Sequence, residues 1–470
     1  MIDKEGAAAW AWREFGQAEL GDARRTRRAV KFAAKLVCGP ASSIPRALSN
    51  DAEIKGAYRL IENDGVNHAG LLSGHVKHTA ERVRNEEKVL VVQDTTTLNF
   101  GEREGLGPIH DRLASKGMYA HTALAVTYER HEVLGVLDQQ VWVRDAKKRP
   151  RNESGYARKK RERESEVWRK GQEHVAEVLG RMGKGTPRVI AVFDREGDIF
   201  EAFEEQERLG HSFIIRATRN RLLDTEAMDE SAAKGTGGRR YLLDEVMKAP
   251  IRARKEVTVP ARSGRPARVA ELEIRAMEAV VRPPINRMRR GVSLSLNIVL
   301  AVEPDPPAGC DPLIWYLVTR EPIATEHDVL EVVRGYEARW LIEEFHMGLK
   351  TGCRLEDRQM ETRAVLENFL AFATVIAWQM LALRDIARRP EPIAAQTVLR
   401  PTQLEVLRRL KPRLPKGCTA REALRAIATL GGFMGRKGDG EPGWRTLWRG
   451  LEKLASIESG YLLALERCGQ

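Results

Sequence analysis

Residues 336–350 read YEARWLIEEFHMGLK and carry polar and apolar residues at helical spacing. Positions three, four or seven apart share one face of a helix. At about 100° per residue, Arg339, Glu343 and Lys350 fall within about 60° of Tyr336. The apolar residues fall on the opposite side: Leu341, Ile342, Phe345 and Leu349. The stretch predicts one helix whose polar face gathers a phenol, two cations and a carboxylate.

This pattern also has an ordinary interpretation. Arg339 and Glu343 are an i, i+4 pair of the kind that decorates solvated helices. His346 borders the polar face, and because imidazole is a poor ligand for Mg²⁺, we expect it to be a hydrogen-bonding neighbour. The rest of the chain must decide between a solvated surface and a reactive site.

Two further carboxylates close apolar runs. Asp94 follows KVLVVQ, and Asp194 follows RVIAVF. An aspartate in such a place is often only a turn residue or an N-cap. If both runs are strands of one sheet, however, their ends converge on one crevice. A helix carrying Glu343 across the same edge then completes a constellation of three carboxylates.

Such a cluster repels itself unless cations compensate, and all-oxygen ligands suit Mg²⁺ or Mn²⁺. Two such ions can clamp the attacking and leaving oxygens of an in-line phosphoryl displacement. Arg339 and Lys350 beside the cluster are suited to hold phosphates, and Tyr336 can hydrogen-bond one.

The composition favours a polyanionic partner. The 470 residues contain 78 Lys and Arg against 66 Asp and Glu, a net charge of +12. Nucleic acid is the partner that such a balance favours, with an acidic membrane surface as the competing interpretation. The five cysteines show no CxxC spacing, which argues against a disulfide frame or a zinc site. Charges interrupt the N-terminal apolar run, so it does not resemble a signal peptide.

Several segments outline the organisation. Residues 1–68 look helical, with Asp22 as N-cap of an arginine-rich helix, and a β-rich block spans about 205–322. KVLVVQD and the 118–144 region read as strands, and 144–171 is a basic segment of unassigned role. Residues 366–383 are the most apolar, but they include Glu367, Asn368 and Gln379, which predicts a buried helix rather than a membrane span.

Taken together, these motifs resemble the insertion-sequence-four (IS4) family of bacterial cut-and-paste DDE transposases, and its Tn5 type in particular. The spacing Tyr336-x2-Arg339-x3-Glu343-x6-Lys350 resembles that family's YREK signature. Asp94 in QDTTTL and Asp194 in FDREGDI look like its two aspartates. LGDARRTRR, KGAYRLIEN, HTALAV and LGGFMGRK extend the resemblance over nearly the whole chain.

The resemblance implies an α/β fold with an RNase H-like catalytic core. It implies an N-terminal helical domain over 1–68 that binds transposon ends, and a catalytic domain over 69–365 with the β-rich insertion. A C-terminal helical domain over 366–470 would support dimerisation. The partners are then double-stranded DNA, as inverted repeats and as target, and a second copy of the chain in a DNA-bridged synaptic complex.

It also implies a reaction and residue roles. A metal-activated water nicks the end, the 3′-hydroxyl forms a hairpin that is then opened, and the 3′ ends attack target DNA. Asp94, Asp194 and Glu343 bind two Mg²⁺ ions, for which Mn²⁺ substitutes, while Tyr336, Arg339 and Lys350 hold phosphates. Trp315 stacks on a flipped base, although a strand tryptophan is more often core. The expected end contacts are Arg24, Arg25, Arg28 and Arg59, with Arg216, Arg219 and Trp340 as further DNA contacts.

Two rivals remain open. One is a structure-selective nuclease on an RNase H-like fold, and the other is a DNA-binding repressor derived from a transposase. The resemblance places the protein in the bacterial cytoplasm, associated with the nucleoid.

Overall fold

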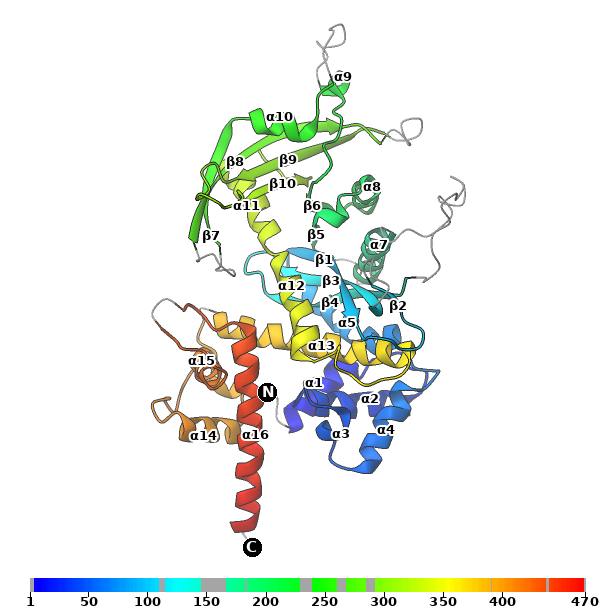
Figure 1. The fold of residues 1–470 in the computed structure, drawn as a ribbon, viewed down its shortest axis with the longest axis vertical. Helices are drawn as coiled ribbons and strands as arrows, with labels where there is room; N and C mark the ends of the chain where they lie inside the picture. The colour runs from blue at the N-terminus through cyan, green and yellow to red at the C-terminus, as the bar shows by residue number, and fades with distance from the viewer. Residues whose placement is uncertain are drawn as a thin grey trace.

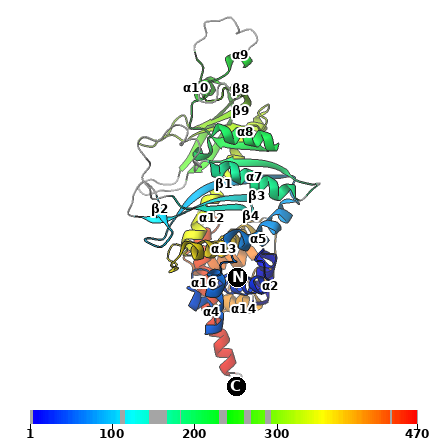
Figure 2. The ribbon, with the colours of Figure 1, turned by 90° about the vertical axis from the view of Figure 1, so that its right-hand side faces the viewer.

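A computed structural model describes residues 4–109, 115–144, 166–181, 183, 185–228, 239–259, 268–284, 292–389, 391–436 and 439–468. Most of the basic segment, residues 145–165, lies outside the described residues, so its role stays unassigned. Figures 1 and 2 show a twisted sheet in the middle of an elongated molecule, with helices gathered at one end and further strands at the other.

One mixed sheet of ten strands runs through the described part of the chain, in the order β2-β3-β1-β5-β6-β10-β9-β8-β7, with β4 on β3. Its strands are β1 (Lys88–Asn99), β2 (Gly107–Pro108), β3 (Lys116–Thr127), β4 (Val133–Trp142), β5 (Arg188–Phe193), β6 (Ser212–Arg216), β7 (Ile251–Val259), β8 (Arg268–Val281), β9 (Leu294–Val302) and β10 (Ile314–Thr319).

The portion β4-β3-β1-β5-β6 has the arrangement of an RNase H-like core. β1, β3 and β4 are antiparallel neighbours, whereas β5 runs parallel to β1 and β6 parallel to β5. β10 continues the sheet antiparallel to β6 and joins it to the long strands β9, β8 and β7. The expected β-rich block therefore extends the same sheet.

Helices cover this sheet and flank it. α7 (Glu166–Gly180) and α8 (Phe200–Leu209) lie beside β3 to β6, and the short 3₁₀ turn η1 (Arg195–Gly197) follows β5. α9 (Thr225–Met228) and α10 (Leu242–Lys248) accompany β8 and β9. α11 (Glu326–Glu337) and α12 (Trp340–Met347) descend from the upper strands across β1 in Figure 1.

The helix expected over 336–350 is not a single regular helix, and that prediction is wrong. α11 ends at Glu337, a tight turn follows in which the Arg339 amide donates to the Tyr336 carbonyl at 3.0 Å, and η3 (Gly348–Gly352) is a π-helix. η3 packs directly against α13: a Cβ at Gly352 would lie only 2.9 Å from Met380 Sδ, and one at Gly348 would make ordinary contact with Ala377 at 3.4 Å. Packing against α13 thus overrides the regular period.

The long helix α13 (Arg363–Arg388) connects all parts of the molecule. It is long and apolar enough to cross a membrane, but 78% of its apolar window is buried inside the protein, which confirms the interpretation as a buried helix. Phe372 stacks on Phe15 at 5.1 Å, and the Asn368 amide donates to the Ile61 carbonyl at 2.9 Å. α13 also contacts β4 and α15, so it lies between the sheet and both helical ends.

The two helical ends are as expected in character. The N-terminal helices are α1 (Lys4–Phe15), α2 (Ala23–Leu36), α3 (Ile44–Ala47), α4 (Asp51–Ile61) and α5 (His68–Val83). After α13 come the 3₁₀ turn η4 (Ala395–Thr397), α14 (Pro401–Leu410), α15 (Ala420–Leu430) and α16 (Trp444–Cys468). Asp22 caps α2 by accepting from the Arg24 amide at 2.7 Å, which confirms the predicted start of the arginine-rich helix.

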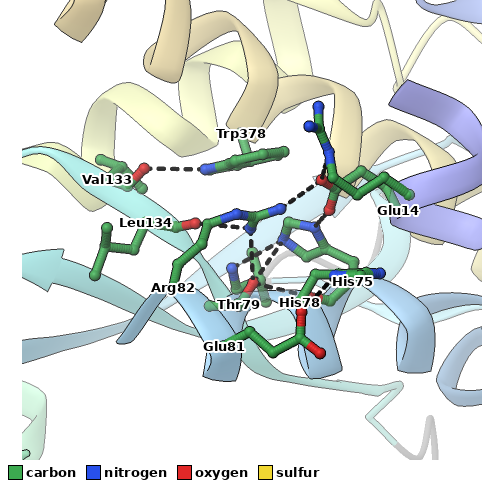
Figure 3. Close-up of polar contacts among 11 residues, drawn as sticks. Glu14, His75, His78, Thr79, Glu81, Arg82, Val133, Leu134 and Trp378 are labelled. Atoms are coloured by element: carbon green, nitrogen blue, oxygen red, sulfur yellow. Dashed lines mark hydrogen bonds and ion pairs between the residues drawn. The ribbon is translucent and has the colours of Figure 1, made fainter. Parts of the chain in front are cut away.

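A buried polar network ties α1 to α5 and α13 (Figure 3). Glu14 is fully buried, accepts from His75 at 2.7 Å and also pairs with Arg82, whose guanidinium lies 4.2 Å from the ring centre of Trp378. Burial alone would raise the pKa of Glu14, but the hydrogen bonds and charges of His75 and Arg82 lower it to about 2. The N-terminal helices are thus held to the core by an ionised carboxylate.

We predict that Glu14→Gln lowers the free energy of unfolding by about 3 kcal/mol at pH 7, because it leaves the half-buried Arg82 guanidinium without its anion. Since the folded-state pKa of Glu14 is lowered from 4.5, its stabilisation is present above about pH 4.5 and is lost as the pH falls toward 2. Urea unfolding at pH 7 and pH 3 measures both effects.

The matched control is Glu81→Gln, which removes a carboxylate that is 60% exposed and pairs with His78 in the same view. Its effect should stay within about 0.5 kcal/mol. A Glu14→Gln variant as stable as that control would contradict the anchoring role.

Candidate active site

Asp94 and Asp194 lie side by side because of the strand register. β1 and β5 pair in parallel, with Gln93 opposite Phe193. The next residue along each of the two segments is an aspartate, so Asp94 and Asp194 are neighbours. Asp194 directly follows the last residue of β5, as the apolar run predicted, and its carboxylate accepts from the Glu196 amide at 2.8 Å. Asp94 does not end a strand, which corrects the prediction: the β-branched residues that follow it carry β1 on to Asn99, paired with β3.

Glu343 reaches the same place from α12. An atom of the Arg339 guanidinium, Nη1, lies 3.2 Å from Glu343 Oε1 and 3.6 Å from Asp94 Oδ2. A single cationic side chain therefore bridges the strand carboxylate and the helix carboxylate. The i, i+4 pair seen in the sequence is present, and it lies against the sheet at Asp94, although the Glu343 side chain is still 39% exposed.

Negative charge is crowded at this point. Burial, together with the negative charges of Asp194 and Glu343, raises the pKa of Asp94 to about 7. The Thr95 amide, which donates to Asp94 Oδ1 at 2.7 Å, and the Arg339 charge act in the opposite direction and do not compensate fully. The carboxylates thus form a site that is short of positive charge.

Divalent cations fit this donor set. Asp94, Glu343 and His346 each offer a ligand atom, and these atoms lie within 4.8 Å of one another. Asp194 does not belong to that group, but its charge acts on Asp94 from the neighbouring strand. Carboxylates that are crowded, partly buried and undercompensated are what a hard divalent ion requires.

Tyr336, Arg216 and Trp315 form a second layer beside the carboxylates. The Tyr336 hydroxyl shares a hydrogen bond with Arg216, and burial raises the pKa of Tyr336 even though the Arg216 and Arg339 charges lower it. Arg216 also donates to the Ile314 carbonyl at 2.8 Å. The Trp315 ring lies 5.6 Å from the Tyr336 ring, centre to centre, and is only partly buried. Trp315 therefore belongs to the edge of the core and not to its interior.

Two further residues of the motif lie nearby. Burial lowers the pKa of His346 to about 3, and the charge of Lys350 contributes, which places Lys350 close to that ring. No hydrogen-bond partner of His346 Nε2 is found among the described residues. The Trp340 side chain is 52% exposed at the start of α12, so it does not simply fill the core.

The remaining expected DNA contacts lie elsewhere. Arg24, Arg28 and Arg59 are exposed on α2 and α4, on the far side of α13 from the sheet in Figures 1 and 2. Arg25 is half-buried and donates to the carbonyls of Leu20 at 3.0 Å and Gly65 at 3.1 Å, so it also holds the local fold. Arg219 is exposed after β6.

Asp198 was not predicted, although the DREGD sequence contained it. It is buried, and its Oδ2 accepts from the Thr218 amide at 2.7 Å and the Arg219 amide at 2.9 Å. Its other oxygen pairs with Arg221 at 2.5 Å. Asp198 thereby joins the turn that follows β5 and Asp194 to the loop after β6 that carries Arg219.

Two family models match parts of the chain. A transposase DNA-binding model matches residues 7–66, which include α2, α4 and the exposed arginines. A model of the Tn5 transposase dimerisation domain matches residues 375–466, which include the end of α13 and α14 to α16. Both matches lie outside the carboxylate cluster and flank it in the sequence.

We predict that Asp94→Asn stabilises the ion-free protein at pH 8. The folded-state pKa of Asp94 is raised from 3.8 to about 7, so its contribution to stability is present below pH 3.8 and is lost as the pH rises through 7. An amide removes that loss, and the gain at pH 8 is at most about 4 kcal/mol. Urea unfolding in the presence of a chelator measures it. A variant that is less stable than the wild type at pH 8 would contradict the charge crowding.

Proposed function

Because the chain is a Tn5-like transposase, with DNA-binding and dimerisation regions on either side of an RNase H-like core, we propose that it catalyses cut-and-paste transposition. In this proposal it binds the inverted repeats of a transposon, nicks the ends, forms and opens hairpins, and joins the 3′ ends to target DNA. The observation that carries the proposal is the meeting of Asp94, Asp194 and Glu343 at one end of β5, with Arg339 between two of them.

In this proposal the three carboxylates hold two Mg²⁺ ions, which Mn²⁺ can replace. Bound ions would activate the attacking oxygen and neutralise charge on the phosphate and the leaving oxygen. Arg339, released from its carboxylates, is placed to grip the scissile phosphate with Lys350. Tyr336 and Arg216, already hydrogen-bonded to each other, offer a hydroxyl and a cation to a neighbouring phosphate. Every step is a displacement at phosphorus, so one site can serve them all.

The flanking regions supply recognition and assembly. We propose end binding by residues 1–68 through Arg24, Arg28 and Arg59, whose exposure on α2 and α4 supports phosphate contact, and through Arg25 with its local structural role. Arg219 is a further contact with lower support. The proposed catalytic region is 69–365, and residues 366–470 support the homodimer that brings two ends together. We propose that the protein acts in the cytoplasm in association with the nucleoid, where its DNA substrates lie.

A nuclease and a repressor are the competing functions. A nuclease on this core would not join ends, and it would not require the DNA-binding and dimerisation regions matched here. A repressor would not require the crowded carboxylates, whose repulsion costs stability. Both features together favour the transposase reaction.

We predict that Glu343→Gln and Asp194→Asn each lower DNA cleavage by several orders of magnitude, because each removes a charge that holds the ions. Both variants should still bind the transposon end, which a mobility shift can check beside the cleavage assay. Near wild-type cleavage by either variant would contradict the assignment of the substituted residue as an ion ligand. If both variants still repress transcription from the transposon end as strongly as the wild type, the repressor interpretation is the better one.

We also predict that Trp315→Ala impairs hairpin formation more than the first nick. A flipped base needs a stacking partner, and the Trp315 ring lies at the edge of the core beside Tyr336. Hairpins and nicks can be quantified on one denaturing gel. Equal loss of both products, with a lower melting temperature, would favour a purely structural tryptophan. Tyr316→Ala is the matched control, because it removes a half-buried ring of the same strand that packs against a different core cluster from that of Trp315.

A further inference from the structure

The histidine that follows Glu343 by three positions has no role in the reaction described above. His346 is 5% exposed, and its Nε2 has no hydrogen-bond partner in the described part of the chain. A buried polar atom without a partner costs free energy, so it calls for a specific explanation. Sequence analysis suggested a hydrogen-bonding neighbour, but the structure gives Nε2 no such bond.

The position of His346 suggests what the ring binds. One ligand atom of His346, one of Asp94 and one of Glu343 lie within 4.8 Å of one another. Glu343 and His346 are three apart on α12 and so share a face, which is turned to the strand that carries Asp94. Two carboxylates and an imidazole then converge from one helix and one strand.

A second buried histidine shows that burial alone does not leave an imidazole nitrogen without a hydrogen bond. His121 on β3 is fully buried, yet one ring nitrogen bonds Thr95 Oγ1 at 2.8 Å and the other bonds Gln93 Oε1 at 3.0 Å. His121 therefore has no nitrogen left for an ion. In His346, by contrast, Nε2 has no partner in the described part of the chain, and a nitrogen of the ring lies within 4.8 Å of the crowded carboxylates.

We propose that His346 is a third protein ligand of the divalent ion held by Asp94 and Glu343. The proposal rests on the ion site of the proposed function and adds a nitrogen donor to a set of carboxylates. Mg²⁺ has little affinity for nitrogen, whereas first-row transition ions accept imidazole. The ion shared with His346 should therefore be Mn²⁺ in preference to Mg²⁺, while an ion held only by carboxylates shows no such preference.

The test uses Mn²⁺ with the full chain and no DNA. Pulsed electron paramagnetic resonance detects a nitrogen bound to Mn²⁺ through its nuclear modulation. We expect ¹⁴N modulation from the wild-type protein and its replacement by the ¹⁵N pattern when only histidine is labelled with ¹⁵N. Bound Mn²⁺ without nitrogen modulation would overturn the proposal, and this arm requires no variant that could misfold.

Variants show which residue supplies the nitrogen, and they separate the role of His346 from the ion site on which it rests. His346→Gln should abolish the modulation and weaken Mn²⁺ binding about tenfold or more, with little change for Mg²⁺. His174→Gln is the control, because that exposed ring bonds Asp138 at 3.1 Å, far along the chain from the site. Modulation that survives in His346→Gln would overturn the proposal.

Asp94→Asn tests the underlying site and should weaken both ions. If Asp94→Asn leaves Mn²⁺ and Mg²⁺ binding unchanged, or if neither ion binds the wild-type chain, the proposed function loses its ion site and this inference fails with it. If Asp94→Asn weakens both ions but the wild type lacks nitrogen modulation, only the role of His346 fails.

Discussion

Repulsion between neighbouring carboxylates is the constraint on which the site depends. The parallel register of β1 and β5 sets Asp94 beside Asp194. The helix α12 brings Glu343 to the same place, where Arg339 contacts both Glu343 and Asp94. Burial and the neighbouring charges raise the pKa of Asp94 to about 7, although Arg339 contacts it. A fold does not keep such an arrangement for stability, since a neutral residue at position 94 would relieve it. Divalent cations held by these carboxylates, as proposed above, would relieve the repulsion.

The rest of the molecule holds this cluster in place and connects it to the flanking regions. α13 packs against the π-helix that follows α12, against β4 and against the N-terminal helices. The buried Arg384 of α13 pairs with Glu344, the residue next to Glu343, and donates to Asp385 at 2.6 Å. The part of α13 that lies in the matched dimerisation region therefore contacts α12, the helix that carries Glu343.

Local signals in the sequence were enough to predict much of this. The apolar run before Asp194, the N-cap Asp22 and the interrupted apolar helix 366–383 each rest on contacts within one element, and each prediction is confirmed. The regular helix over 336–350 failed because its turns adapt to α13, and such packing leaves no trace in periodicity. The strand continues beyond Asp94 because three threonines follow it and pair with β3, and this pairing outweighs the turn preference of an aspartate. His346 was set aside on ligand chemistry alone, since its missing hydrogen bond becomes visible only in three dimensions.

The most direct test of the central claim is an end-processing assay with the wild-type protein. The protein is incubated with Mg²⁺ and DNA that carries the inverted repeats flanking its own gene, and the products are resolved on a denaturing gel. The account predicts nicks, hairpins and products in which transposon ends are joined to target DNA. Tight binding of the ends without any cleavage, in Mg²⁺ or in Mn²⁺, would contradict it and would leave a DNA-binding protein with a relic of a catalytic site.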